Sequence, residues 1–320
     1  MRTEWTDARV FVTEPEGMIG GAIARALVAH GVGEKLLCAD GLDLRDGLAV
    51  ERYFERERPT HVFLAAGRKG GILANQRFPA DLMLDNLAVL PNVIRAAFHT
   101  GVKKLLYLGS SCLYPRDCPQ PMEERSLLTG PFEPTNESYS VAKMAALKLC
   151  QAIRTQYGRS FVAAIPTNIY GPGDDFDLEN AHVVAALIRK FRDACESGQD
   201  AVTLWGTGQA RREFIFSEDL GRACVFVMEH YDDREPINIG FGEDISIRAL
   251  ADHVQNIVGF RGAIRFDTSK PDGMPRKWLD AKKLTALGWR PSVSFEEGLR
   301  RTYEWYEQTQ WAVTQVASVG

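Results

Sequence analysis

The chain has 320 residues, 45% of them hydrophobic, so it is long enough to bury one large core as a two-lobed unit of enzyme size. A formal net charge of −4, without any run of like charge, gives no basic surface, so binding to nucleic acid is not expected. No 18 apolar residues run together, and acids occur among the first eight residues, so we expect a cytoplasmic protein that does not enter a membrane.

The cysteines are scattered without a CxxC pair or a metal-site spacing, so we expect reduced thiols and no metal. Four lie in apolar segments and are predicted to be small core residues, namely Cys38, Cys150, Cys195 and Cys224. Cys118 follows Cys112 in a proline-rich segment and is predicted to be an exposed loop residue, where it could form a disulfide with Cys112.

The first predicted unit is a strand, a glycine turn and a helix. A β-branched and aromatic stretch at 9–13 precedes the turn, and helical apolar spacing follows at 22–30. Gly17 and Gly20 fit the later glycines of a Gly-x-x-Gly-x-x-Gly pattern, whereas Glu14 stands in the place of the first. Such a turn lets backbone amides approach a pyrophosphate. It is also consistent with an ordinary strand-to-helix connection that binds no ligand.

The next predicted strand, at 35–39, ends at Asp40, where a carboxylate can accept hydrogen bonds from an adenosine ribose. A turn aspartate before Gly41 is an equally good interpretation. Further strands at 61–66, 104–108 and 161–165 alternate with helices at 79–99 and 139–157. Apolar strands alternating with helices predict an α/β protein with a doubly wound parallel sheet of the Rossmann type.

The alternation ends after residue 172. We predict an amphipathic helix at 182–196, strands at 204–205 and 211–216, and a helix with a cap at Ser217. A strand at 238–240 and a helix-rich region at about 243–310 follow. Apart from residues 213–241, this part is expected to form the smaller C-terminal lobe.

The most informative stretch is Tyr-Ser-Val-Ala-Lys at 139–143. Residues four apart share a helical face, so the Lys143 ammonium is predicted beside the Tyr139 oxygen, where it would lower the pKa of the phenol. Such pairs also arise by chance on exposed helices. Gly-Ser-Ser-Cys at 109–112 follows the carboxyl end of the strand predicted at 104–108. Open α/β sheets bind ligands at this end of their strands.

With the glycine turn, Ser110, Tyr139 and Lys143 in this order, the chain resembles the extended short-chain dehydrogenase/reductase superfamily. Within it, the chain resembles the GDP-L-fucose synthase family over roughly residues 9–306. The stretches that carry this resemblance are 67–72, 109–115, 133–137, 166–172, 180–182, 205–208 and 212–214.

The resemblance implies a 3,5-epimerase and 4-reductase that converts GDP-4-keto-6-deoxy-D-mannose to GDP-L-fucose. A C4 carbonyl acidifies the protons on C3 and C5, so one acid and one base can invert both centres, and Cys112 and His182 match the family's pair. Tyr139 would protonate the reduced oxygen, Ser110 would hydrogen-bond it, and Lys143 would hold the cofactor ribose. From composition alone, Cys112 would be a buried thiol and His182 a helix-cap residue.

The resemblance also implies the binding sites. Cofactor contacts are expected from Glu14, Gly17, Met18, Ile19, Gly20, Asp40, Leu108, Gly109, Ser110, Lys143, Pro166, Asn168, Ile169 and His182. Substrate contacts are expected from Lys190, Trp205, Arg212 and Lys277. The dinucleotide domain would comprise 1–168 and 213–241, the nucleotide-sugar lobe 169–212 and 242–312, and a tail 313–320. A homodimer is expected through the helices at 79–99 and 139–157.

Three positions depart from the family pattern. Glu14 replaces a glycine, and Asp40 lies where a basic residue normally holds the 2′-phosphate, so NAD(H) is credible beside the NADP(H) that the family implies. The cations Arg45, Arg68 and Lys69 could counter this effect. Lys190 stands where an arginine is usual, which gives up a bidentate phosphate contact and points to an altered nucleotide sugar. The second interpretation therefore keeps the fold and the epimerase pair but takes a related GDP-4-keto sugar, such as a heptose or colitose precursor, as substrate. An epimerase without net reduction is a further form of this interpretation. The alternative from a different functional class is a protein that has lost turnover and senses a dinucleotide or a nucleotide sugar.

Overall fold

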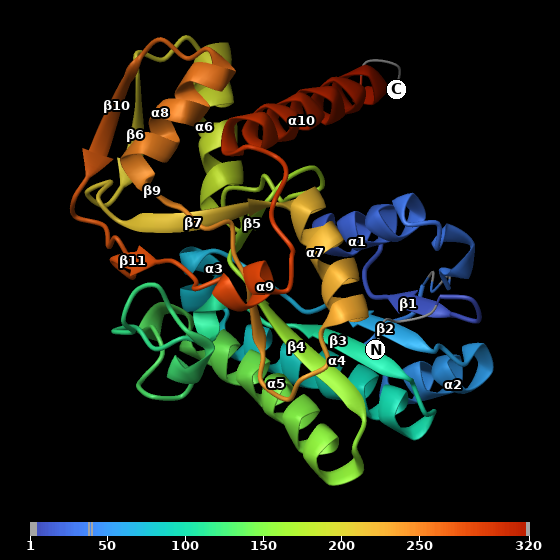
Figure 1. The fold of residues 1–320 in the computed structure, drawn as a ribbon. Coiled ribbons are helices and arrows are strands. Elements are labelled where there is room, and N and C mark those ends of the chain that lie inside the picture. Colours follow the sequence, from blue (N-terminus) through green and yellow to red (C-terminus); the bar gives the residue numbers. More distant parts are fainter. Residues whose placement is uncertain (1–4, 38, 40, 318–320) are drawn as a thin grey trace.

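The computed structural model describes residues 5–37, 39 and 41–317, with side chains to residue 309. Its centre is a five-stranded parallel sheet in the order β1-β2-β3-β4-β8 (Figure 1). These strands are β1 (Val10–Val12), β2 (His61–Leu64), β3 (Lys104–Leu108), β4 (Ser160–Pro166) and β8 (Ile237–Ile239). The predicted α/β fold of the Rossmann type is confirmed.

Helices cover both faces of this sheet, as Figure 1 shows. One face carries α1 (Met18–Ala29) and α7 (Ser217–His230), and the other carries α2 (Gly47–Glu57), α4 (Pro79–His99) and α5 (Glu137–Tyr157). Alternate strand residues point to opposite faces, so Leu105 and Tyr107 pack in one core cluster and Leu106 and Leu108 in the other. Because both faces are buried, the strands read as continuous apolar runs.

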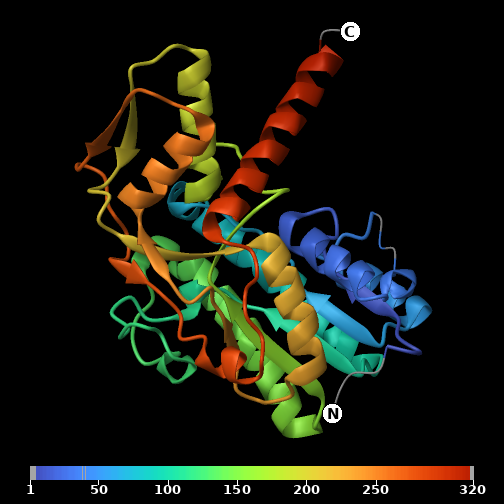
Figure 2. The same ribbon diagram turned by 45° about the horizontal axis from the view of Figure 1, so that its top comes forward.

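The C-terminal lobe is built around two smaller sheets. One contains β5 (Asn168–Tyr170), β7 (Arg211–Phe216), β9 (Asp244–Ser246) and β11 (Arg276–Lys277), and the other pairs β6 (Ala201–Trp205) with β10 (Ala263–Asp267). The helices α6 (Val183–Glu196), α8 (Ile247–Val258) and α10 (Phe295–Ala317) surround a third core cluster. In Figure 2, α10 runs away from the lobe toward the C-terminus.

Short helices connect these elements. They are η1 (Gly33–Lys35), α3 (Ile72–Arg77), η2 (Ser111–Leu113), η3 (Glu124–Ser126), η4 (Pro134–Asn136) and α9 (Lys282–Ala286). Among the helices of the described residues, none combines the length and apolar character needed to cross a membrane.

Several local predictions are wrong. In the stretch predicted as a strand at 35–39, Lys35 ends a 3-10 helix, and Leu36 makes a single bridge to Val10. Residues 38 and 40 lie outside the described residues. The region after 243 is less helical than predicted because it contributes β9, β10 and β11, whose partners come from β7 and β6.

The predicted cap at Ser217 is also wrong, since Ser217 is the first residue of α7 and its buried hydroxyl has no hydrogen-bond partner. Cys195 is exposed, and Cys118 is buried in the same core cluster as Tyr114 and Met122, the reverse of both predictions. Cys150 and Cys224 are buried as predicted. All five cysteines of the described part are free, so Cys112 and Cys118 are not joined.

Candidate active site

A cavity of about 450 Å³ opens at the carboxyl ends of β3 and β4, between the central sheet and the C-terminal lobe. This volume falls within the ~300–1,000 Å³ that is usual for small-molecule sites. Most predicted site residues line it: Met18, Ile19, Leu108, Gly109, Ser110, Cys112, Tyr139, Lys143, Pro166, Asn168, Ile169, His182, Lys190, Trp205, Arg212 and Lys277. The remaining predicted residues Glu14, Gly17 and Gly20 lie outside its lining, and Asp40 lies outside the described residues.

The glycine turn leaves room for a pyrophosphate at the start of α1. Gly17 is the N-cap residue, no side chain caps these amides, and the first turn contains no acid. A Cβ at Gly20 would overlap the carbonyl oxygens of Thr13 and Glu14, so the helix can approach the strand only with glycine there. These features fit a dinucleotide whose phosphates meet the N-terminal end of the helix.

Glu14 gives this turn an unusual side chain. Its φ of 50° lies in the left-handed region that favours glycine. Its side-chain Oε1 accepts a hydrogen bond at 3.2 Å from the backbone N–H of Gly67, in the turn after β2. The carboxylate therefore bridges two of the turns that border the proposed dinucleotide site.

Lys143 does not sit against the phenol oxygen as predicted. Its buried ammonium donates to the carbonyl oxygens of Ala66 at 3.1 Å and Leu108 at 3.4 Å, and lies 6.0 Å from the centroid of the Tyr139 ring. Burial lowers the pKa of Lys143 to about 8, although the negative charge of Glu14 acts to raise it.

The prediction of a lowered pKa for Tyr139 is wrong. Burial raises the pKa of Tyr139, the nearby Cys112 raises it further, and a hydrogen bond with Ser110 only partly opposes them. Burial therefore outweighs the influences that would favour the phenolate.

Cys112 lies in η2, whose N-cap is Ser110. The Ser110 hydroxyl accepts a hydrogen bond from the Cys112 N–H at 3.2 Å, which fixes the turn. The Cys112 sulfur lies 3.2 Å from Nδ2 of Asn136 and 3.4 Å from Nζ of Lys277. Burial raises the pKa of Cys112, but the Lys277 charge and the hydrogen bonds from Ser110 and Lys277 outweigh it, so the pKa is lowered.

His182 precedes α6 at the N-cap position, but its side chain makes no capping hydrogen bond. Its ring is accessible from the cavity that it lines. Desolvation by the surrounding protein, followed by the charges of Lys69 and Lys277, lowers the pKa of His182 to about 4. The imidazole is therefore neutral near pH 7.

The lobe supplies the remaining cations of the cavity. Arg212 on β7 and Lys277 on β11 are register partners, and burial lowers the pKa of Arg212. Lys190 projects from α6, and burial likewise lowers its pKa. Trp205 at the end of β6 is 41% exposed, and the ammonium of Lys270 lies 5.5 Å from the centroid of its ring.

Sequence reasoning missed some of the cavity residues. Glu133 and Asn136 line it, although their stretch at 133–137 served only to establish the family resemblance. Lys69, named from the sequence only as a cation near the 2′-phosphate, also lines it, with its ammonium 3.7 Å from Asp174. The described residues include no group of three or more His, Cys, Asp or Glu side chains that could hold a metal ion.

The NAD dependent epimerase/dehydratase family model matches residues 10–240. The parallel sheet, the glycine turn and the cavity at the strand ends agree with that match. The chain belongs to the NAD dependent epimerase/dehydratase family.

Within that family the chain is similar to GDP-L-fucose synthases, which confirms the resemblance seen in the sequence. GDP-L-fucose synthase 1 of Arabidopsis thaliana is 48% identical over 300 residues, or 93% of each chain. A GDP-L-fucose synthetase from Naegleria fowleri bound to NADP has a TM-score of 0.88 at 30% identity, covering 97% of this chain and 95% of that one. A GDP-6-OMe-4-keto-L-xylo-heptose reductase from Campylobacter jejuni has a TM-score of 0.89 at 30% identity, covering 97% and 100%.

Proposed function

We propose that the protein is a bifunctional 3,5-epimerase and 4-reductase that converts GDP-4-keto-6-deoxy-D-mannose to GDP-L-fucose. The observation that carries this proposal is the placement of two sets of residues in one cavity: Cys112 and His182 for proton exchange, and Ser110, Tyr139 and Lys143 for reduction. The similarity to GDP-L-fucose synthases over nearly the whole chain supports the choice of substrate.

The cavity separates the roles of the proton-transfer groups. Cys112, whose pKa is lowered, is the base that removes the acidified protons at C3 and C5. Proton return by His182 requires the imidazolium, which is scarce at a pKa of about 4. The negative charge of a bound nucleotide sugar would oppose the lesser part of this pKa shift, which comes from the cations Lys69 and Lys277 and not from desolvation.

The reductive half of the reaction uses the other set. A bound nicotinamide dinucleotide would supply the hydride for C4. The amides at the start of α1, together with Lys143, would hold this cofactor, and Ser110 would orient the C4 oxygen. Tyr139 would then donate its proton to that oxygen, which suits a phenol that stays protonated through its raised pKa.

For the dinucleotide, we propose that NAD(H) is used at least as well as the NADP(H) that the family resemblance implies. Glu14 is exposed at the turn, and its carboxylate would repel a 2′-phosphate. The three cations that could counter it already face carboxylates: Arg45 with Asp43 at 2.9 Å, Arg68 with Asp85 at 3.1 Å, and Lys69 with Asp174 at 3.7 Å. A preference for NADPH of about 100-fold or more in kcat/KM would reject this proposal.

The deciding experiment is incubation with GDP-4-keto-6-deoxy-D-mannose and NADPH or NADH in heavy water, with cofactor absorbance and product mass followed together. Cofactor oxidation with deuterium at C3 and C5 is the expected result. Exchange without cofactor oxidation would indicate an epimerase alone. If a folded protein gave neither cofactor oxidation nor deuterium incorporation, this substrate would be rejected. Another nucleotide sugar, or a sensor without turnover, would then be favoured.

A related GDP-4-keto heptose is the second candidate substrate. The similarity to the Campylobacter jejuni reductase favours it, as does Lys190, a point charge where the family has a bidentate arginine. The same assay with a GDP-4-keto heptose in place of the 6-deoxy sugar distinguishes the two by kcat/KM.

We further propose that the protein is a cytoplasmic homodimer. The cysteines of the described part are free thiols, which suits a reducing compartment such as the cytoplasm.

The exposed apolar residues of two long helices support the homodimer. The helices α4 and α5 leave Leu84, Leu87 and Val141 exposed, which would suit a four-helix contact between two copies. Sedimentation of the wild type and of a Leu84→Arg, Leu87→Arg double variant tests this, since a dimer held there becomes a monomer.

A further inference from the structure

The polar groups around the Cys112 sulfur carry this inference. Two of them, Nδ2 of Asn136 at 3.2 Å and Nζ of Lys277 at 3.4 Å, point hydrogen-bond donors at Sγ. An ammonium has no acceptor, and the amide nitrogen of asparagine has none either. A neutral thiol cannot give its proton to these two groups, whereas a thiolate accepts a hydrogen bond from both. The geometry therefore suits the ionised sulfur.

The orientation of the Asn136 amide is consistent with this arrangement. Its Nδ2 faces the sulfur, and its Oδ1 lies 3.4 Å from the hydroxyl oxygen of Ser140. The same hydroxyl donates to the carbonyl oxygen of Cys112 at 3.0 Å. The start of α5 is thereby joined to the turn that carries the thiol.

We propose that Lys277 is the counter-ion of a Cys112 thiolate, and so a positioning residue for proton transfer rather than primarily a ligand for the phosphates of the substrate. Lys277 is only 9% exposed, and a buried ammonium needs a compensating partner. Among the described residues, the Cys112 sulfur is the side-chain hydrogen-bond partner of this ammonium, and no carboxylate forms an ion pair with it.

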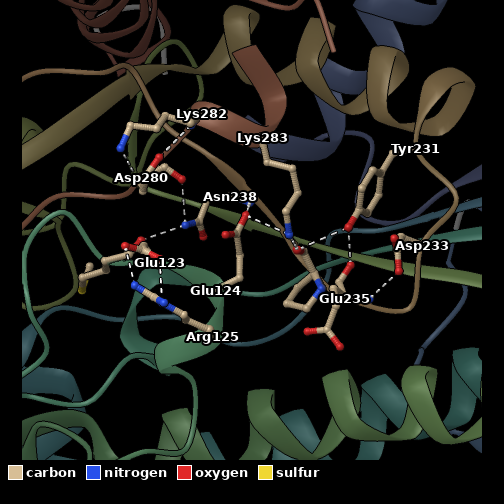
Figure 3. A network of polar contacts seen from close by, with 12 residues as sticks. Glu123, Glu124, Arg125, Tyr231, Asp233, Glu235, Asn238, Asp280, Lys282 and Lys283 are labelled. Carbon is tan, nitrogen blue, oxygen red and sulfur yellow. Dashed lines mark hydrogen bonds and ion pairs between the residues drawn. The ribbon is translucent and has the colours of Figure 1, made fainter. Parts of the chain in front are cut away.

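The strand that carries Lys277 is fixed against the segment that follows Cys112. Met122 donates to the carbonyl oxygen of Trp278 at 2.7 Å and accepts from the N–H of Asp280 at 2.9 Å. Asn238 donates from Nδ2 to the carbonyl oxygen of Asp280 at 3.1 Å, while its N–H donates to Glu124 at 3.0 Å (Figure 3). These bonds join the backbone just after Lys277 to the loop that follows the thiol turn.

Other ionisable groups surround the sulfur from the neighbouring elements. Arg212 on β7 and Tyr139 on α5 interact electrostatically with Cys112, while Glu133 before η4 and His182 before α6 line the same cavity. Arg212 also favours the thiolate, but after burial the charge of Lys277 is the largest influence on the pKa of Cys112. Lys277 is therefore the cation whose removal should be felt most.

The test measures ionisation of the thiol without substrate or dinucleotide. Alkylation by iodoacetamide is followed against pH, and modification of the Cys112 peptide is quantified by mass spectrometry, so that the exposed Cys195 does not interfere. In K277M the midpoint should rise by about 1 pH unit or more, because an opposite charge has been removed. K277R should keep the wild-type midpoint. K282M, which removes a lysine whose side chain is 87% exposed, should leave the midpoint unchanged.

An unchanged midpoint in a folded K277M protein overturns the proposal. Circular dichroism checks the fold, and if K277M unfolds, K277Q takes its place, because glutamine keeps a donor but not the charge. The role in proton transfer rests on the proposed function, whereas the ionisation does not. If the midpoint rises in K277M while deuterium exchange at C3 and C5 is unaffected at pH 7, the role of Lys277 in proton transfer is overturned. The ion pair between Lys277 and the Cys112 thiolate is then still supported.

Discussion

The two ends of the cavity differ in how they are built. At the cysteine end, side chains from β11 and from the end of η4 point hydrogen-bond donors at one sulfur. At the dinucleotide end, the contacts expected for a cofactor are backbone amides at the start of α1, and the side chain added to the turn, Glu14, is an acid. A site made of side chains is sensitive to each of them, whereas a site made of backbone tolerates a changed side chain as long as the backbone keeps its path. The two ends should therefore fail in separate ways when they are mutated.

The largest expected effect separates reduction from proton exchange. Tyr139→Phe should lower cofactor oxidation by about 10²–10⁴-fold, because the general acid is removed. Deuterium exchange at C3 and C5 should persist, since Cys112 and His182 remain. The control is Tyr157→Phe, at the other end of α5, where the side chain is 53% exposed. An equal loss of exchange in Tyr139→Phe would show that the residues do not have separate roles.

The reverse change is Cys112→Ser, which should abolish exchange at C3 and C5 because a serine hydroxyl is not ionised near neutral pH. Cofactor should still bind, as shown by titration calorimetry, because the dinucleotide end is untouched. Cys195→Ser, which replaces an exposed thiol, serves as the matched control. Normal exchange in Cys112→Ser would remove Cys112 from the proton-transfer step.

The next prediction acts on the dinucleotide end. In Gly20→Ala the new methyl group would overlap two carbonyl oxygens of the turn, which should cost about 1–3 kcal/mol and weaken dinucleotide binding by about 10–100-fold. Gly17→Ala is a graded control, since its Cβ would stay 3.3 Å from the Glu14 carbonyl oxygen. Calorimetric titration measures the affinity. The alkylation midpoint of Cys112 should not move, and a shift there would contradict the separation of the two ends.

A smaller effect is expected for Glu14, where charge and backbone strain can be told apart. Both Glu14→Gln and Glu14→Gly should raise the ratio of NADPH to NADH affinity by about tenfold, because each removes the carboxylate. Only glycine relieves the left-handed φ of 50°, so only Glu14→Gly should gain about 1 kcal/mol in the free energy of unfolding. If the affinity ratio changes with glycine alone, the backbone and not the charge selects the dinucleotide.

Much of the central fold could be predicted because its signals are local. The helix at Pro79–His99 and the strand at Lys104–Leu108 match the predicted bounds, since a proline begins the helix and an uninterrupted apolar run marks the strand. The pairing of β6 with β10 could not be predicted, because neither strand carries a signal that names a partner so distant in the chain. The prediction of a strand at 35–39 is wrong because an apolar run does not show whether its backbone pairs beyond one residue.

The site shows the same division. The stretches 109–112 and 139–143 lie at their predicted positions in the fold. Residues of both stretches line one cavity. The contact between Lys277 and Cys112 joins residues 165 positions apart, so spacing gave no indication of it. The lowered pKa expected for Tyr139 was wrong because a shared helical face does not show that two backbone carbonyls would take up the Lys143 ammonium.

The smallest effect would reveal a remaining link between the two ends. The pKa of Lys143 is about 8, so its ammonium is present below that value, and the rate of reduction should fall as the pH rises through it. Glu14 opposes the effect of burial on this pKa, so Glu14→Gln should move the alkaline midpoint to lower pH. The pH dependence of kcat for cofactor oxidation measures the shift, with Glu16→Gln, an exposed acid of the same turn, as the control. A midpoint that stays in place, or moves to higher pH, would mean that Glu14 acts on the dinucleotide alone and that the ends are independent. A downward shift would mean that the acid in the glycine turn also helps to keep the ammonium charged beside Tyr139, which would give a physical reason for a carboxylate at that position.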